Sequence, residues 1–284
     1  MYIDVNGARL FFDVDGEGLT PDGPDMREKP TVVMVHGGPG GDHSVSKPYF
    51  RQLTDIAQVV YYDHRGNGRS SGDDPTDWNL RQWGDDLRGL CDALGIVRPI
   101  VVGTSFGGFV ALSYATRYPD HAAALVLIST AAKVDFAEVY EAFERLGGSN
   151  VAGIARNYWE NPTDEGRALY RDVCVPLYQR SKSSSSDWLS RVLWRNETAL
   201  HFNGPNSEHG NMDFRDALQR ITCPVLLMVG DEDPITPPVF SDVIAENLSN
   251  SKLTYHRFSE CGHGVVADKP NEALHAIRGF IVGL

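Results

Sequence analysis

Short apolar stretches recur along the chain, and between them apolar residues return at every third or fourth position. Six stretches of six to eight residues are dominated by Val, Ile, Leu and other apolar side chains. Runs this short predict strands that are buried on both faces of a parallel sheet. The expected strands cover residues 31–37, 57–63, 99–105, 122–129, 224–231 and 253–258.

The segment 80–95 has the spacing of a helix with one buried face. Leu80, Trp83, Leu87 and Leu90 return every three or four residues, which places them on one side of an α-helix. Strands that alternate with such helices predict an α/β fold with a mostly parallel, doubly wound sheet. At the N-terminus, alternating apolar and polar side chains over 1–16 predict one further strand.

The middle of the chain departs from this alternation. No stretch of 134–218 has the pattern of a strand, and aromatic-rich helical segments replace it. An all-helical insertion between two strands predicts a cap over the carboxyl ends of the sheet, where α/β folds bind ligands. We therefore divide the chain into a core (1–133 and 219–284) and a helical cap (134–218). The serine-rich segment 181–188 predicts an exposed loop.

Charge and cysteine content narrow the classes of function. The 284-residue chain has a formal net charge of −12, which argues against nucleic-acid binding. It has no run of about 18 apolar residues, and acids stand where a signal peptide has bases, so we expect neither a membrane span nor a secretory leader. The four cysteines form no C-x-x-C pair, which is typical of reduced cysteines in a cytoplasmic protein.

One stretch places a serine at the junction of an expected strand and an expected helix. Gly103 and Gly107 flank Ser105 in the pattern G-x-S-x-G. A strand-to-helix turn this tight strains the central residue and exposes its hydroxyl, and the flanking positions have no room for side chains. The helix N-terminus behind the serine favours developing negative charge. Ser105 is therefore the candidate nucleophile.

A serine nucleophile needs a base to take its proton and an acid to hold that base. His263 lies in a glycine-flanked loop, SECGHGV, after the last expected strand. The loop VGDEDPITP follows the strand before it and carries Asp231, Glu232 and Asp233. The order serine, acid, histidine is one in which catalytic triads occur. The residues alone leave open which of the three acids is the partner.

The glycine-rich loop HGGPGG, residues 36–41, follows the first buried strand. Acyl transfer places negative charge on a carbonyl oxygen, which backbone N–H groups stabilise. Gly38 and Phe106, the residue after the serine, are the expected donors, and Gly37 is expected to contact substrate. The loop has neither the lysine of a P-loop nor the G-x-G-x-x-G pattern, which argues against phosphate binding.

In this order, HGGPGG, YDHRGNGRSS, GTSFGG, GDEDPITP and CGHG resemble the motifs of the α/β hydrolases, and specifically of the branch that contains the prolyl aminopeptidases (proline iminopeptidases). The resemblance covers nearly the whole chain. It implies an α/β-hydrolase fold with a helical cap, in which Ser105 is the nucleophile, Asp233 the acid and His263 the base. It implies Gly38 and Phe106 as oxyanion donors, and neither a metal nor an organic cofactor.

At two positions where prolyl aminopeptidases have glutamates that bind a free amine, this sequence has other residues. The segment NGPN at 203–206 resembles a part of prolyl aminopeptidases that continues with a glutamate for the α-amine, but Ser207 stands there and Glu208 follows. Pro234 stands where members often have a second glutamate. A buried ammonium needs a carboxylate partner. The candidate replacements are Glu208, Glu160 and Glu197.

These observations favour a serine hydrolase that forms an acyl-enzyme on a small ester, lactone or amide. Three alternatives stay open: a proline iminopeptidase that releases N-terminal proline, a C–C bond hydrolase or lyase, and a non-catalytic ligand receptor on the same fold. The aromatic content of the middle segment predicts an apolar acyl pocket over the serine, with Trp159 and Trp194 against the substrate. The aromatic residues concerned are Tyr158, Trp159, Trp188, Trp194 and Phe202.

Overall fold

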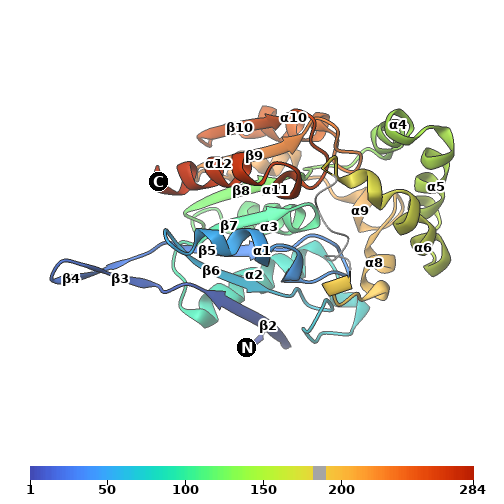
Figure 1. The fold of residues 1–284 in the computed structure, drawn as a ribbon. Helices are drawn as coiled ribbons and strands as arrows, with labels where there is room; N and C mark the ends of the chain where they lie inside the picture. The colour runs from blue at the N-terminus through green and yellow to red at the C-terminus, as the bar shows by residue number, and fades with distance from the viewer. Residues whose placement is uncertain (182–189) are drawn as a thin grey trace.

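The computed structural model describes residues 1–181 and 190–284, and one large sheet runs through the described part of the molecule (Figure 1). The strands of this sheet are β1 (Tyr2–Val5), β2 (Ala8–Asp15), β5 (Thr31–Val35), β6 (Gln58–Tyr62), β7 (Ile100–Thr104), β8 (Ala124–Ile128), β9 (Val225–Gly230) and β10 (Leu253–Phe258). Their order across the sheet is β1-β2-β6-β5-β7-β8-β9-β10. The pairs β1–β2 and β2–β6 are antiparallel, and every pair from β6 to β10 is parallel. The prediction of a mostly parallel α/β sheet is thus confirmed.

Helices cover both faces of this sheet, which makes it doubly wound. They are α1 (Lys47–Phe50), α2 (Leu80–Leu94), α3 (Phe106–Arg117), α10 (Pro238–Asn247), α11 (Val265–Asp268) and α12 (Pro270–Val282). Successive side chains of a strand point to opposite faces. Val33 and Val35 therefore belong to one buried cluster with apolar residues of α2, α3 and α10, while Val32 and Met34 belong to a second cluster with residues of α1, α11 and α12. Burial on both sides explains why these strands are apolar throughout.

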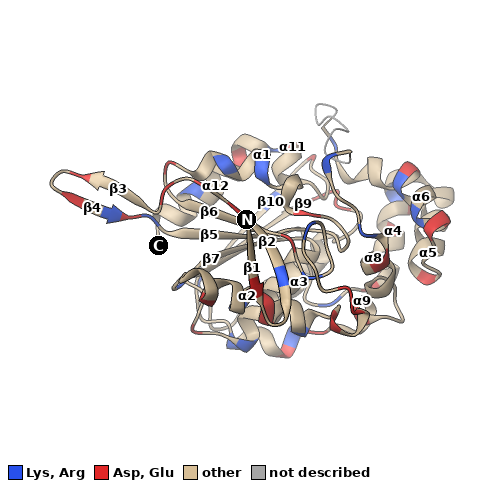
Figure 2. Cartoon of the chain, turned by 90° about the horizontal axis from the view of Figure 1, so that it is seen from below, with Lys and Arg blue, Asp and Glu red and all other residues tan. Residues whose placement is uncertain are grey.

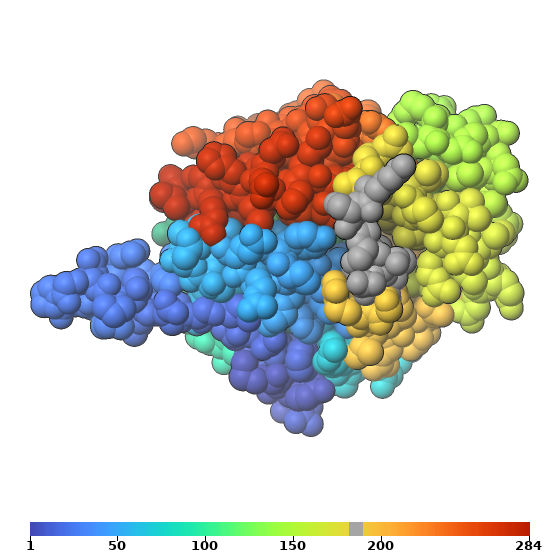
Figure 3. Space-filling model, in the orientation of Figure 1, coloured from blue at the N-terminus to red at the C-terminus, as the bar shows by residue number. Residues whose placement is uncertain are grey.

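The N-terminal prediction is wrong in one respect, because residues 1–16 form two strands rather than one. Asn6 and Gly7 both have positive φ angles, 49° and 80°, and turn β1 back onto β2. This is the backbone that two-residue hairpin turns require, and Asn-Gly is a preferred sequence for it. A second hairpin, β3 (Leu19–Asp22) with β4 (Asp25–Glu28), projects from the body as an arm (Figures 1 and 3).

Between β8 and β9 the described residues form helices and no strand. The helices are α4 (Phe136–Gly147), α5 (Ser149–Glu160), α6 (Asp164–Val173), α8 (Asn196–Phe202) and α9 (Glu208–Asn211). The 3₁₀ helices of the described chain are η1 (His43–Val45), η2 (Arg51–Leu53), η3 (Pro75–Asp77), η4 (Val175–Tyr178) and η5 (Arg215–Arg220).

We call the described residues from α4 to α9 the helical insertion. It lies at one end of the sheet, on the opposite side of the molecule from the β3–β4 arm (Figures 1 and 3). The predicted boundaries of core and cap remain a prediction. Of the expected loop at 181–188, only Ser181 is among the described residues. Trp188, which the sequence placed in the pocket, therefore lies outside them. No helix in the described part of the chain is long and apolar enough to cross a membrane.

Candidate active site

Ser105 lies in the turn between β7 and α3, in a backbone conformation that L-residues rarely adopt. Its φ is 55° and its ψ is −123°. Three hydrogen bonds hold this turn. The Ser105 N–H donates to the Ile128 carbonyl at 2.9 Å, and the Ser105 carbonyl accepts from the Thr130 hydroxyl at 2.9 Å and from the Gly108 N–H at 2.8 Å. A strained residue that its surroundings hold in place is typical of a functional site.

The glycines on either side of this serine leave no space for a side chain. A Cβ at Gly103 would lie 2.6 Å from the carbonyl oxygen of Gly107, and one at Gly107 would lie 2.0 Å from that of Val35. The turn therefore packs directly against the end of β5. This close approach brings the serine next to the glycine-rich loop that follows β5.

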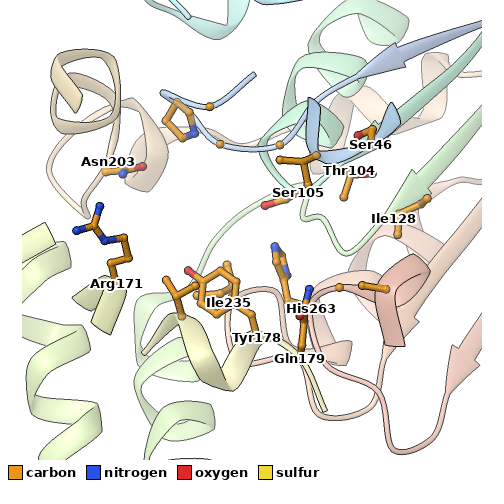
Figure 4. Close-up of a pocket in the computed structure, with 18 of the residues that line it drawn as sticks. Ser46, Thr104, Ser105, Ile128, Arg171, Tyr178, Gln179, Asn203, Ile235 and His263 are labelled. Atoms are coloured by element: carbon orange, nitrogen blue, oxygen red, sulfur yellow. The ribbon is translucent and has the colours of Figure 1, made fainter. Parts of the chain in front are cut away.

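His263 and Asp233 form a buried pair on the loops after β10 and β9. The His263 Nδ1 lies 2.8 Å from Oδ2 and 3.0 Å from Oδ1 of Asp233. The carboxylate also accepts from the Ile235 and Thr236 N–H groups and from the Thr236 hydroxyl, and it is fully buried. Because a carboxylate only accepts, the hydrogen of the imidazole is on Nδ1, and Nε2 is left as the basic nitrogen. In Figure 4 the imidazole points toward Ser105.

The structure separates the three acids that the sequence left open. Asp231 pairs with Arg257 at 3.0 Å, and Glu232 pairs with Arg180 at 2.8 Å, both at the surface. Asp233 is the one of the three that reaches His263. The difference follows from the turn at Asp233, where two backbone N–H groups point at its carboxylate and hold it inward.

The expected oxyanion donors lie on the two segments that meet at the serine. A Cβ at Gly37 would lie 3.5 Å from the Cβ of Ser105, so the glycine-rich loop runs beside the turn. Phe106 is the first residue of α3, where a backbone N–H has no partner within the helix. Gly38 has a φ of 141°, which suits glycine, and it faces the same cavity as Ser105.

A cavity of about 250 Å³ opens at Ser105 and His263. Its lining contains Gly37 and Gly38 from the core and aromatic side chains from the helical insertion. Those predicted from the sequence to line it, and placed there by the structure, are Tyr158, Trp159, Trp194 and Phe202. Further aromatic side chains of the lining are Tyr49, Phe50, Phe109, Tyr170 and Tyr178. We call this cavity the acyl pocket, after the role that the sequence predicts for it.

The sequence pattern of the alpha/beta hydrolase fold family matches residues 30–270. The chain belongs to this family. The proline iminopeptidase PfmaB of Pestalotiopsis fici is 27% identical over 99% of this chain and 98% of its own length. The putative carbamate hydrolase RutD of a Caulobacter species is 29% identical over 95% of this chain and 97% of its own length. The structure of a thermophilic esterase from Thermogutta terrifontis is similar, with a TM-score of 0.76 and 24% identity over 100% of this chain and 98% of that one.

The structure does not bring Glu208 of this α/β hydrolase into the acyl pocket. Both of its carboxylate oxygens accept from the Leu80 N–H, at 3.0 and 3.1 Å, at the N-terminus of α2. A helix N-terminus has unpaired N–H groups and attracts anions, which explains the direction of the side chain. The other two candidates are surface residues: Glu160 pairs with Arg156 at 3.3 Å, and Glu197 lies 3.9 Å from Arg195. None of the three lines the pocket.

Several polar residues of the hydrolase's pocket were not found from the sequence. They are Arg167 and Arg171 of α6 and Asn203, which line it together with His209, a histidine that the sequence suggests at most as a substrate contact. The two arginines are four residues apart, a spacing that places them on one face of a helix. That spacing was visible in the sequence, but only the tertiary structure places this face toward the serine. No group of three or more His, Cys, Asp or Glu side chains in the described chain is arranged to hold a metal ion.

Proposed function

We propose that this protein is a serine hydrolase that cleaves a small ester, lactone or amide through an acyl-enzyme. One observation carries the proposal: a serine in a strained turn shares a cavity with a histidine whose other ring nitrogen is held by a buried carboxylate. Nucleophile, base and orienting acid in this arrangement are the parts that acyl transfer by serine requires.

In the proposed reaction, the Ser105 oxygen attacks the substrate carbonyl while Nε2 of His263 takes the hydroxyl proton. Asp233 stabilises the resulting imidazolium and stays ionised. The N–H groups of Gly38 and Phe106 bind the negative oxygen of the tetrahedral intermediate. His263 then gives its proton to the leaving group, and an ester bond joins the acyl group to Ser105. Water, activated by His263, attacks that ester and releases the acid.

The fold indicates the type of reaction more closely than it indicates which acyl group the substrate carries. The relatives are named as an iminopeptidase, a carbamate hydrolase and an esterase, and one fold can host many substrates. The aromatic lining of the pocket favours an apolar chain next to the carbonyl. We propose that the chain acts in the cytoplasm, because all four cysteines are free and buried.

A proline iminopeptidase is the second candidate, because several relatives at 27–28% identity have that name. A free α-ammonium would have to lie near the serine, where the pocket's described lining has no carboxylate. Moving a charged amine from water to a site that has no carboxylate partner for it costs roughly several kcal/mol. We therefore rank this activity below hydrolysis of substrates without a free amine.

This ranking predicts that p-nitrophenyl butyrate is hydrolysed with a kcat/KM at least about a hundredfold above that for proline p-nitroanilide, after each rate is divided by its uncatalysed rate. The two reactions are followed by the absorbance of p-nitrophenolate and p-nitroaniline. Glu208→Gln serves as a control and is expected to leave the preference unchanged. A preference for the proline substrate that disappears in Glu208→Gln would instead establish the iminopeptidase.

A further inference from the structure

The charges of the acyl pocket are opposite in sign to those of the whole chain. The chain has 38 acidic residues and a net charge of −12. The described lining of the pocket nevertheless contains no Asp or Glu, and its Lys and Arg residues are Arg167 and Arg171. Helix α6 carries acidic and basic residues (Figure 2), but its acids do not line the pocket. The pocket therefore favours an anion over a cation.

Both arginines have guanidinium N–H groups that make no hydrogen bond to the described residues. Arg167 donates to the Tyr158 hydroxyl at 3.3 Å and lies over the Trp194 ring, 5.3 Å from its centroid. No carboxylate of the described residues is within ion-pair distance of Arg167. Arg171 has only its sequence neighbour Asp172 as an ionic partner in the described chain, at 3.9 Å between exposed side chains. A guanidinium has five N–H donors in a planar fork that matches a carboxylate.

Buried polar atoms at the same pocket also lack partners. Asn203, Trp159 and His209 are 5%, 6% and 7% exposed. Asn203 Oδ1, Trp159 Nε1 and His209 Nδ1 have no hydrogen-bond partner among the described residues. Buried polar groups are rarely left unpaired, because desolvation without a hydrogen bond is unfavourable. Each of these atoms has almost no accessible surface, so a rotation of its side chain must come before a contact with a polar ligand group.

Three of these residues, Arg171, Arg167 and Asn203, meet at one end of the pocket. Figure 4 shows the guanidinium of Arg171 directed toward the amide of Asn203, and Ser105 with His263 away from them. The Asn203 amide donates to the same Tyr158 hydroxyl that Arg167 contacts, which joins Asn203 and Arg167 through one oxygen. A half-turn of the amide exchanges its oxygen and nitrogen, so Asn203 can offer either a donor or an acceptor.

We propose that this end of the pocket binds a carboxylate at the far end of the acyl chain, so that the preferred substrates are monoesters or monoamides of dicarboxylic acids. The inference rests on the proposed function for its reaction, whereas the binding of the carboxylate stands by itself. Arg171 and Arg167 supply the charge and the N–H donors, and Asn203 fixes the orientation of the bound group. The aromatic side chains between this end and Ser105 hold the methylene chain.

Binding is tested in the Ser105→Ala protein by calorimetry with straight-chain dicarboxylates from succinate to suberate, each against the monocarboxylate of equal carbon number. We expect at least one dicarboxylate to bind about tenfold tighter than its monocarboxylate. Adding Arg171→Gln should remove this difference, whereas adding Arg156→Gln, an exposed arginine of α5 that does not line the pocket, should leave it. Equal binding of the two series, no detectable binding, or an equal effect of both arginine variants would overturn the proposal.

Measuring the hydrolysis of two esters tests the carboxylate site and the proposed function separately. The wild-type protein is given mono-p-nitrophenyl adipate and p-nitrophenyl hexanoate, with uncatalysed rates subtracted, and we expect about tenfold higher kcat/KM for the adipate ester. If hexanoate is hydrolysed in a Ser105-dependent reaction with no preference for adipate, the carboxylate site is wrong and the serine hydrolase stands. If hydrolysis does not depend on Ser105, the proposed function is wrong, and the calorimetry still decides the carboxylate site.

Discussion

Ser105→Ala is expected to lower kcat for p-nitrophenyl butyrate by about a million-fold, as the loss of a triad nucleophile commonly does. The substitution removes one oxygen and keeps the Cβ, and the hydrogen bonds that hold the turn are made by the backbone of residue 105. The fold should therefore be retained, with thermal unfolding close to that of the wild type. The measurement is steady-state hydrolysis at high protein concentration, with a purified preparation free of host esterases.

Ser129→Ala provides a matched control for this variant. Ser129 is a buried serine with a φ of 49° at the end of the neighbouring strand β8, and it does not line the pocket. Its replacement should change kcat by no more than about threefold, because Ser129 is not one of the reacting groups. If Ser105→Ala keeps more than about a tenth of the activity, the serine mechanism is wrong.

Asp233→Asn is expected to lower kcat by roughly ten-thousand-fold. An amide at this position can turn its NH₂ group toward Nδ1 of His263, which would move the ring hydrogen to Nε2 and leave no base for Ser105. Asp231→Asn is the control: it removes a charge from the same loop but only breaks a surface pair with Arg257, so its effect on kcat should be small.

Both variants are to be compared with the wild type in thermal unfolding, because Asp233 also accepts hydrogen bonds from Ile235 and Thr236. A folded Asp233→Asn protein with the expected loss of kcat supports the assignment. The reverse pattern, a severe loss in Asp231→Asn and a mild one in Asp233→Asn, would show that another acid holds the histidine.

The parallel strands could be predicted from the sequence because burial on both faces requires an unbroken apolar run. The N-terminal hairpin was missed because the alternation of side chains continues on both sides of Asn6 and Gly7, and only the turn pair interrupts it. Strands β3 and β4 gave no signal, since LTPD and DMRE are mostly polar and pair only with each other outside the main sheet.

For the candidate site, the sequence identifies residues by their chemical type but does not show in which direction their side chains point. Ser105 and His263 could be chosen as candidates from the sequence, because the proposed chemistry requires these residue types in loops after strands. The choice of Asp233 over Asp231 came from family resemblance, and the structure supplies its reason in the hydrogen bonds of the turn. Glu208 has the right chemistry for an amine but binds Leu80, 128 residues away, a contact that only the fold determines.

The measurement that tests the central claim most directly is covalent labelling with diethyl p-nitrophenyl phosphate, which phosphorylates an activated serine and releases p-nitrophenolate. We predict that the protein releases one equivalent of p-nitrophenolate and loses activity in parallel, and that peptide mass mapping finds the diethylphosphoryl group on Ser105. Labelling should be abolished in Ser105→Ala and strongly slowed in His263→Ala. Inactivation without modification of Ser105, or labelling of Ser105 at an unchanged rate without His263, would contradict the account.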